Sequence, residues 1–300
     1  MINFLEIGFF VLLGILLRYS RVDTKKLVAR LNFAAVYISV PALVLLTVPQ
    51  LRVSRETVAL LLAPWGLLCC SAIAVLLLAR IYGWSRPVIG TLLMVVPLGN
   101  TGFMGVPIVN AFLGEAGIPY LIVYDQLGTL LILLSYGTYI TARYGEGGSR
   151  IEYRLVLKRA LLFPPMLAFI VALLLHGVVL PELLILVLKP VAAVLTPLVM
   201  TAIGLQLTLR LKSSVLLPFA YGMAIKLVFA PLLIHAFLSM FGLRGLAYDV
   251  CVLLAGMPPM ITAAVLAVSA RLDAELAVAM SGLGIVLAFI TLPLIHALLI

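Results

Sequence analysis

Long apolar stretches separated by short polar segments dominate the chain. A membrane-spanning helix needs about 20 mainly apolar residues, and ten stretches approach this length. The polar segments between them leave no room for a soluble domain. We therefore predict ten spans, at about residues 2–17, 31–49, 57–80, 88–113, 118–140, 160–178, 183–208, 214–241, 246–268 and 274–299.

The fourth span is interrupted at its centre by the segment 97–107, PLGNTGFMGVP. Gly and Pro break the hydrogen-bond ladder of a helix. Non-helical backbone is tolerated at membrane depth only where protein or a water-filled cavity surrounds it. The segment therefore predicts a broken helix that lines a substrate site. Its candidate site residues are Pro97, Gly99, Asn100, Thr101, Gly102 and Pro107.

A second cluster of helix-breaking residues lies in the ninth span. Sliding the chain against itself by 156 residues (197 − 41) aligns Pro41 with Pro197 and places Asn100 on Gly256, the start of this cluster. Five spans per half is an odd number, so the second half is expected to enter the membrane inverted relative to the first. The candidate site residues here are Gly256, Met257, Pro258, Pro259 and Thr262.

Two breaks at corresponding positions are expected to cross near the middle of the bilayer. Each break exposes a half-helix N-terminus with free N–H groups and a positive dipole end, which suits an anion. Asn100, Thr101 and Thr262 add side-chain donors and acceptors. The alternative is a pair of structural helices kinked by proline.

Asp125 and Lys226 stand out because both lie within predicted spans. A charged residue inside a membrane costs about 2.5–3.5 kcal/mol on insertion scales, so it should face the bundle interior. We expect Asp125, with Gln126 beside it, to act in coupling or gating. Lys226 is expected either to attract an anionic substrate or to pair with Asp125. Structural hydrogen bonding is the alternative for both charged residues.

Composition supports a membrane protein, because 65% of the 300 residues are hydrophobic and only 10% are charged. The formal net charge of +9 resides in loops and not on a basic face of a soluble domain, which argues against nucleic-acid binding. The three cysteines lie in apolar stretches without metal-ligand spacing, so neither a metal nor a cofactor is expected. No nucleophile–base arrangement suggests an enzyme.

Lys and Arg concentrate in alternate loops, which places those loops in the cytoplasm and both termini on the opposite side. We expect the first apolar stretch to be a retained span, because its positive charges follow it, unlike those of a signal peptide. The GEGGS sequence at 145–149 indicates a flexible linker. The predicted organisation is a first repeat (1–145), a cytoplasmic linker (146–159) and a second repeat (160–300).

The sequences NTGFMGVP at 100–107 and YDQLG at 124–128 closely resemble bacterial and archaeal members of the auxin efflux carrier family. The resemblance covers the whole chain. It implies the fold of bile-acid sodium symporters and sodium/proton antiporters, with crossed fourth and ninth helices. Spans 1, 2, 6 and 7 would form a panel domain, spans 3–5 and 8–10 a core domain, and the panel would join a homodimer.

The chain departs from its relatives at both breaks. Plant members of the family carry an Asn-Pro-Asn type sequence in place of 99–102, and bile-acid symporters carry a Glu in place of 256–259. These departures point away from auxin itself and from sodium coupling of the symporter kind.

The function predicted is secondary transport of a small organic anion, a carboxylate that is auxin-like or a dicarboxylate. Transport would occur across the cytoplasmic membrane by alternating access. An inside-negative potential contributes about 2.3 kcal/mol per charge per 100 mV, which favours efflux of an anion. The alternative is a cation/proton antiporter that uses Asp125 as its exchange carboxylate.

Overall fold

The computed structural model describes residues 2–20, 23–51, 55–146, 154, 158, 160–209 and 211–300. Over these residues the chain consists of helices and their connections, without a strand. This agrees with the all-α class that the apolar stretches predict. Of the predicted linker 146–159, only Glu146, Arg154 and Lys158 fall within the described residues.

Helices of the first half follow the apolar stretches. They are α1 Ile2–Arg18, α2 Thr24–Ala34, α3 Val40–Thr47, α4 Arg55–Tyr82, α5 Arg86–Val95, α6 Gly105–Leu113, α7 Ile118–Tyr124 and α8 Thr138–Tyr144. Three π-helical segments join some of these into longer helices: η1 Ala35–Ser39 between α2 and α3, and η4 Asp125–Leu130 and η5 Leu133–Gly137 between α7 and α8.

The second half has a similar series of helices. They are α10 Pro164–Leu174, α11 Glu182–Ala193, α12 Leu195–Gln206, α13 Leu216–Ala224, α14 Ala230–Met240, α15 Leu246–Ala255, α16 Ile261–Ser269 and α17 Ala274–Leu299. A further π-helical segment, η7 Ile225–Phe229, joins α13 to α14.

The second long helix begins earlier than the apolar pattern predicts, at Thr24 instead of residue 31. Asp23 is its N-cap, and the backbone N–H of Lys26 donates to the Asp23 carboxylate at 3.2 Å. Such a cap satisfies one of the free N–H groups of the first turn. The same hydrogen bond lowers the pKa of Asp23 below its ordinary value.

Six continuous helices of the described chain are long and apolar enough to cross a membrane. Their bounds are Thr24–Gln50, Thr57–Tyr82, Glu115–Tyr144, Glu182–Gln206, Ser213–Met240 and Ala274–Leu299. The apolar helices Arg86–Val95, Pro164–Leu174 and Leu246–Ala255 are shorter. The protein is therefore a multi-pass membrane protein, while ten spans in two inverted repeats stay a prediction.

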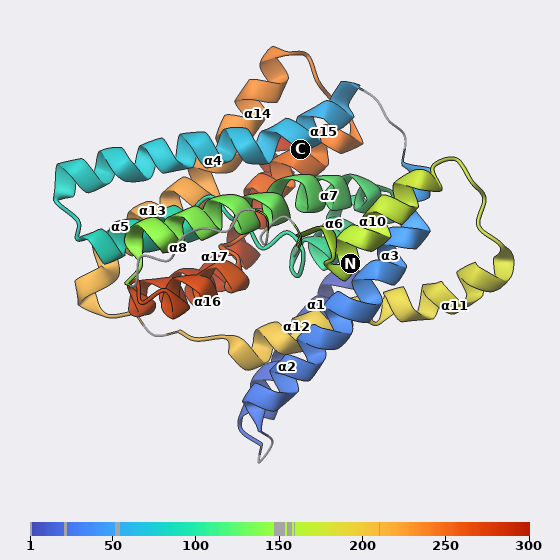
Figure 1. The fold of residues 1–300 in the computed structure, drawn as a ribbon, viewed down its shortest axis with the longest axis horizontal. Helices are drawn as coiled ribbons and strands as arrows, with labels where there is room; N and C mark the ends of the chain where they lie inside the picture. The colour runs from blue at the N-terminus through green and yellow to red at the C-terminus, as the bar shows by residue number, and fades with distance from the viewer. Residues whose placement is uncertain are drawn as a thin grey trace.

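The helices pack in two groups (Figure 1). In the first group α1 and α2 pack on α12, and α3 packs on α10 and α11. In the second group α4 packs on α5, α7 and α15, while α16 and α17 pack on α5 and on each other. Close approach of α1 and α12 depends on Gly14 and Gly204, because a Cβ atom on either would collide with the facing backbone.

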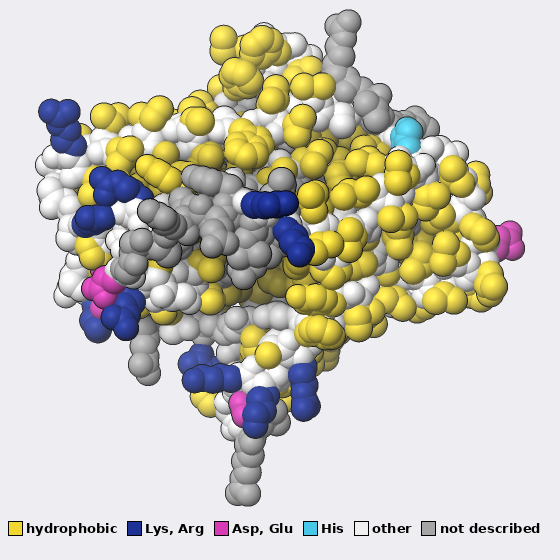
Figure 2. Space-filling model, viewed as in Figure 1, with side chains coloured by type: hydrophobic (Ala, Val, Ile, Leu, Met, Phe, Trp, Pro, Cys, Tyr) yellow, Lys and Arg dark blue, Asp and Glu magenta, His cyan; other side chains and the backbone are white. Residues whose placement is uncertain are grey.

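The surface separates apolar from charged side chains. Figure 2 shows hydrophobic side chains over most of the upper and right parts of the molecule, whereas Lys and Arg lie at the left, near the middle and at the bottom. Many large apolar side chains are exposed, among them Leu186 of α11 at 72%. An apolar exposed surface of this extent suits contact with lipid rather than water.

Candidate functional site

Both helix-breaking clusters interrupt a helix, and the two interruptions lie against each other. The first separates α5 from α6, and the second separates α15 from α16. Gly99 faces Pro259 in an antiparallel bridge. The N–H of Asn100 donates to the carbonyl of Pro258 at 2.7 Å, and the N–H of Met260 donates to the carbonyl of Leu98 at 2.9 Å. Backbone groups freed by the two breaks therefore satisfy each other.

The paired segments are closely packed. Gly99, Met257, Pro258 and Pro259 are all buried. A Cβ atom added to Gly284 of α17 would lie 3.0 Å from Cδ of Pro259, closer than ordinary van der Waals contact allows. The other predicted residues of the breaks lie around this pairing: Pro97 and Pro107 are buried on either side of the first break, and Gly256 is buried at the start of the second.

Asn100 is the polar residue at the centre of the pairing. Its exposed fraction is 0%, and neither Nδ2 nor Oδ1 of its side-chain amide has a hydrogen-bond partner. Its backbone carbonyl accepts from the N–H groups of Met104 and Gly105, the residues at which α6 begins. Leaving a buried polar group unsatisfied costs about 1–3 kcal/mol. The amide is therefore a strong candidate for contact with a ligand.

Asp125 connects the first break to the following long helix. The hydroxyl of Thr101 donates to Oδ1 at 2.5 Å, and Nε2 of Gln126 donates to Oδ2 at 3.0 Å. Gly102 lies alongside, since a Cβ atom there would be 3.4 Å from Oδ1. Predicted residues from both the break and the helix thus form one polar cluster, in which Oε1 of Gln126 has no partner.

Lys226 reaches the same region from η7. It is only 2% exposed, and its Nζ would lie 3.2 Å from a Cβ atom added to Gly99. The ion pairs among the described residues do not include Lys226 or Asp125. Of the two alternatives for Lys226, the structure therefore does not show a pair with Asp125. Lys226 lies beside Gly99, whereas Asp125 lies beside Thr101 and Gly102.

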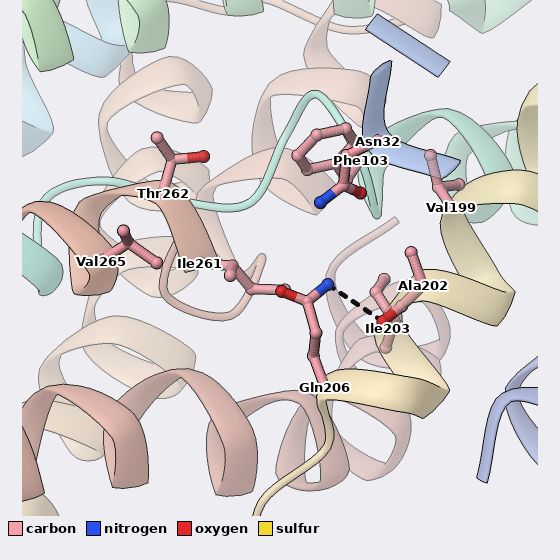
Figure 3. Close-up of a pocket in the computed structure, with 9 residues that line it drawn as sticks. All are labelled: Asn32, Phe103, Val199, Ala202, Ile203, Gln206, Ile261, Thr262 and Val265. Carbon is pink, nitrogen blue, oxygen red and sulfur yellow. Dashed lines mark hydrogen bonds between the residues drawn. The ribbon is translucent and has the colours of Figure 1, made fainter. Parts of the chain in front are cut away.

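A cavity of about 150 Å³ lies between the two groups of helices (Figure 3). Phe103 comes from the first break and Thr262 from the helix after the second, while Asn32 belongs to α2 and Gln206 to α12. The Nε2 of Gln206 donates to the carbonyl of Ala202 at 2.9 Å. The remaining walls are apolar: Val199, Ala202, Ile203, Ile261 and Val265.

Sequence reasoning identified Thr262 of this cavity but missed Asn32, Phe103 and Gln206. The two amides lie toward the ends of long apolar stretches, where polar side chains are commonplace at a membrane interface. Their only signal in the sequence was an amide side chain near the end of an apolar stretch.

The chain is similar in sequence to membrane transporters. The family model for a membrane transport protein matches residues 1–296. An uncharacterized transporter of Methanothermobacter thermautotrophicus is 29% identical over 290 residues, covering 95% of this chain and 93% of the relative. A second uncharacterized transporter, of Methanocaldococcus jannaschii, is 27% identical over 255 residues, covering 82% of this chain and 81% of the relative. The chain thus belongs to the membrane transport protein family, that of the auxin efflux carriers its motifs resemble.

Proposed function

We propose that the protein is a secondary transporter that exports a small organic anion, a carboxylate, across the cytoplasmic membrane. The observation that carries this proposal is the unsatisfied amide of Asn100, buried where the two helix breaks meet. Lys226 adds a cation beside Gly99. The N-termini of α6 and α16 add positive dipole ends. Together these groups suit a carboxylate that needs several donors.

The cavity supports a substrate with one carboxylate and an apolar body. Its polar lining is neutral, supplied by Asn32, Gln206 and Thr262, and its other walls are apolar. A second carboxylate would lose its hydration there without gaining a cation, which is costly. A cavity of about 150 Å³ accommodates a benzene-sized ligand. Small monocarboxylates are therefore better candidates than dicarboxylates.

Alternating access requires two bodies that move relative to each other. The two packed groups of helices are natural candidates for the panel and core domains, because the cavity lies between them. The proposal also includes ten spans in two inverted repeats, both termini outside the cytoplasm, and a homodimer through the panel domain. Export of a monovalent anion needs no coupled ion, since the membrane potential alone contributes about 2.3 kcal/mol per 100 mV.

The test is Asn100→Ala in proteoliposomes loaded with small carboxylates, chosen by their thermal stabilisation of the purified protein. A ligand at 100 times its Kd stabilises by about 2.7 kcal/mol. We expect the variant to lose both this stabilisation and carboxylate flux while it keeps its fold. Asn110→Ala, within α6 and not among the residues that pair the two breaks, should retain both. Unaltered flux in the Asn100 variant would remove that residue from the site.

Asp125 supports a second candidate, a cation/proton antiporter, because its carboxylate has no cation partner among the described residues. Reconstituted protein would then show proton movement driven by a sodium or potassium gradient without any carboxylate present. Asp125→Asn should abolish that movement. Its appearance in the parent protein would reject the anion proposal.

A further inference from the structure

The helix that carries Asp125 is not a regular α-helix. Asp125 and Gln126 are the first two residues of the π-helical segment η4, where α7 ends. A π-helical turn contains an additional residue relative to an α-helical turn, and such turns occur frequently at functional sites. An α-helix rotates by about 100° per residue. Loss of the additional residue would therefore turn Asp125 away from its present direction relative to the rest of the helix.

Two neighbouring residues of α4 contact η4. The ring of Pro64 occupies the space that a Cβ atom on Gly128 would need, with its Cγ and Cβ as the nearest atoms. The indole N–H of Trp65 donates to the carbonyl of Leu127 at 3.1 Å. Pro64 is buried, and Trp65 is 37% exposed on the outer surface of the helix bundle.

These two contacts are of different kinds and act on consecutive residues of η4. The close approach to Gly128 fixes the distance between the helices, because only glycine leaves room for the proline ring. The indole hydrogen bond fixes the direction of the Leu127 carbonyl. Without Trp65, the lipid around this surface would offer that carbonyl no second donor. Both contacts lie within three residues of Asp125.

We infer that Pro64 and Trp65 are positioning residues that hold η4 in its π-helical form and thereby direct Asp125 toward Thr101. This inference rests on the proposed function in giving Asp125 a role in transport. Neither Pro64 nor Trp65 lines the cavity between the two groups of helices. Their effect on transport is transmitted through the backbone of η4.

A crosslinking experiment tests the positioning without relying on transport. Thr101→Cys and Asp125→Cys are introduced together after the three native cysteines are replaced, and a short bifunctional thiol reagent joins them in purified protein. Thr101 and Asp125 are in direct contact in the structure. Gly128→Ala should lower the crosslinking yield several-fold, because its methyl group collides with Pro64.

The double variant Pro64→Ala/Gly128→Ala should restore the yield, because removal of the ring makes room for the methyl group. Gly66→Ala is the matched control: it lies on α4 beside Trp65, and nothing lies within 4 Å of its added Cβ atom. A Gly128→Ala protein that is folded and crosslinks as well as its parent overturns the inference. If that variant does not fold, Trp65→Phe is tested in its place, with Trp84→Phe as the control. A folded Trp65→Phe protein that crosslinks as well as its parent then overturns the inference.

Transport assays on the same variants, made with Thr101 and Asp125 intact, separate this inference from the proposed function. Misplacement of a functional group by 1 Å can cost about 100-fold in rate, so we expect Gly128→Ala to transport at least tenfold more slowly and the double variant to recover. If Asp125→Asn leaves transport unchanged, the role of Asp125 fails, while the crosslinking yields still decide whether Pro64 and Trp65 position it.

Discussion

Asn100, Asp125 and Lys226 differ in how their polar atoms are satisfied. The Asp125 carboxylate accepts from Thr101 and Gln126, whereas the Asn100 amide has no partner. Lys226 is buried without an ion pair among the described residues. All three stand out in an apolar sequence, so their identity was predictable. Their partners were not, because these contacts join residues far apart in the chain.

Lys226 gives a prediction in which stability and function change in opposite directions. Lys226→Met removes an unpaired buried charge, so the Tm of the purified protein should rise. The KM for the exported carboxylate should increase about tenfold or more, because hydrogen bonds to charged groups contribute about 1.5–3 kcal/mol. Lys189→Met, on the exposed helix α11, should change neither quantity. A lower Tm with unchanged KM would assign Lys226 a structural role.

At the scale of elements, the two helix breaks were predictable and the π-helical segments were not. Clusters of Gly and Pro within apolar stretches indicate where a helix must stop. The 156-residue offset places the breaks opposite each other, and in the structure Gly99 and Pro259 face each other. In contrast, η4 and η7 begin without any such signal, because their geometry depends on packing against neighbouring helices.

The packing of α17 against the second break gives a prediction at this scale. Gly284→Ala would place a methyl group 3.0 Å from Cδ of Pro259, and both residues are buried. Overpacking of this kind costs about 1–3 kcal/mol, so we expect a lower Tm in detergent. Gly8→Ala, on α1 with nothing within 4 Å of the added Cβ atom, is the control. Equal Tm values for both variants would mean that α17 moves aside freely.

For the whole molecule, the sequence predicts helices but not which of them pack together. The contact of α1 with α12 depends on Gly14 meeting Gly204, a match between residues in different halves of the chain. Single-sequence patterns contain no signal for such a match, because small residues are common throughout apolar helices. A division into panel and core domains was expected only from the family resemblance, whereas the helix contacts themselves and the cavity between the two groups had to come from the structure.

If the two groups move relative to each other during transport, a covalent link between them should stop it. Asn32 and Thr262 belong to different groups and line the same cavity. In a cysteine-free background, Asn32→Cys/Thr262→Cys joined by a reducible bifunctional reagent should abolish carboxylate flux, and a reductant should restore it.

The control pair lies within one group and away from the cavity. The rings of Tyr37 and Phe163 are 6.3 Å apart between η1 and the start of α10. Tyr37→Cys/Phe163→Cys, linked by the same reagent, should transport at the rate of its unlinked form, since both residues belong to one body. Equal loss of flux in the two linked proteins would contradict relative motion of these groups, whereas loss in the first pair alone locates the moving boundary at the cavity.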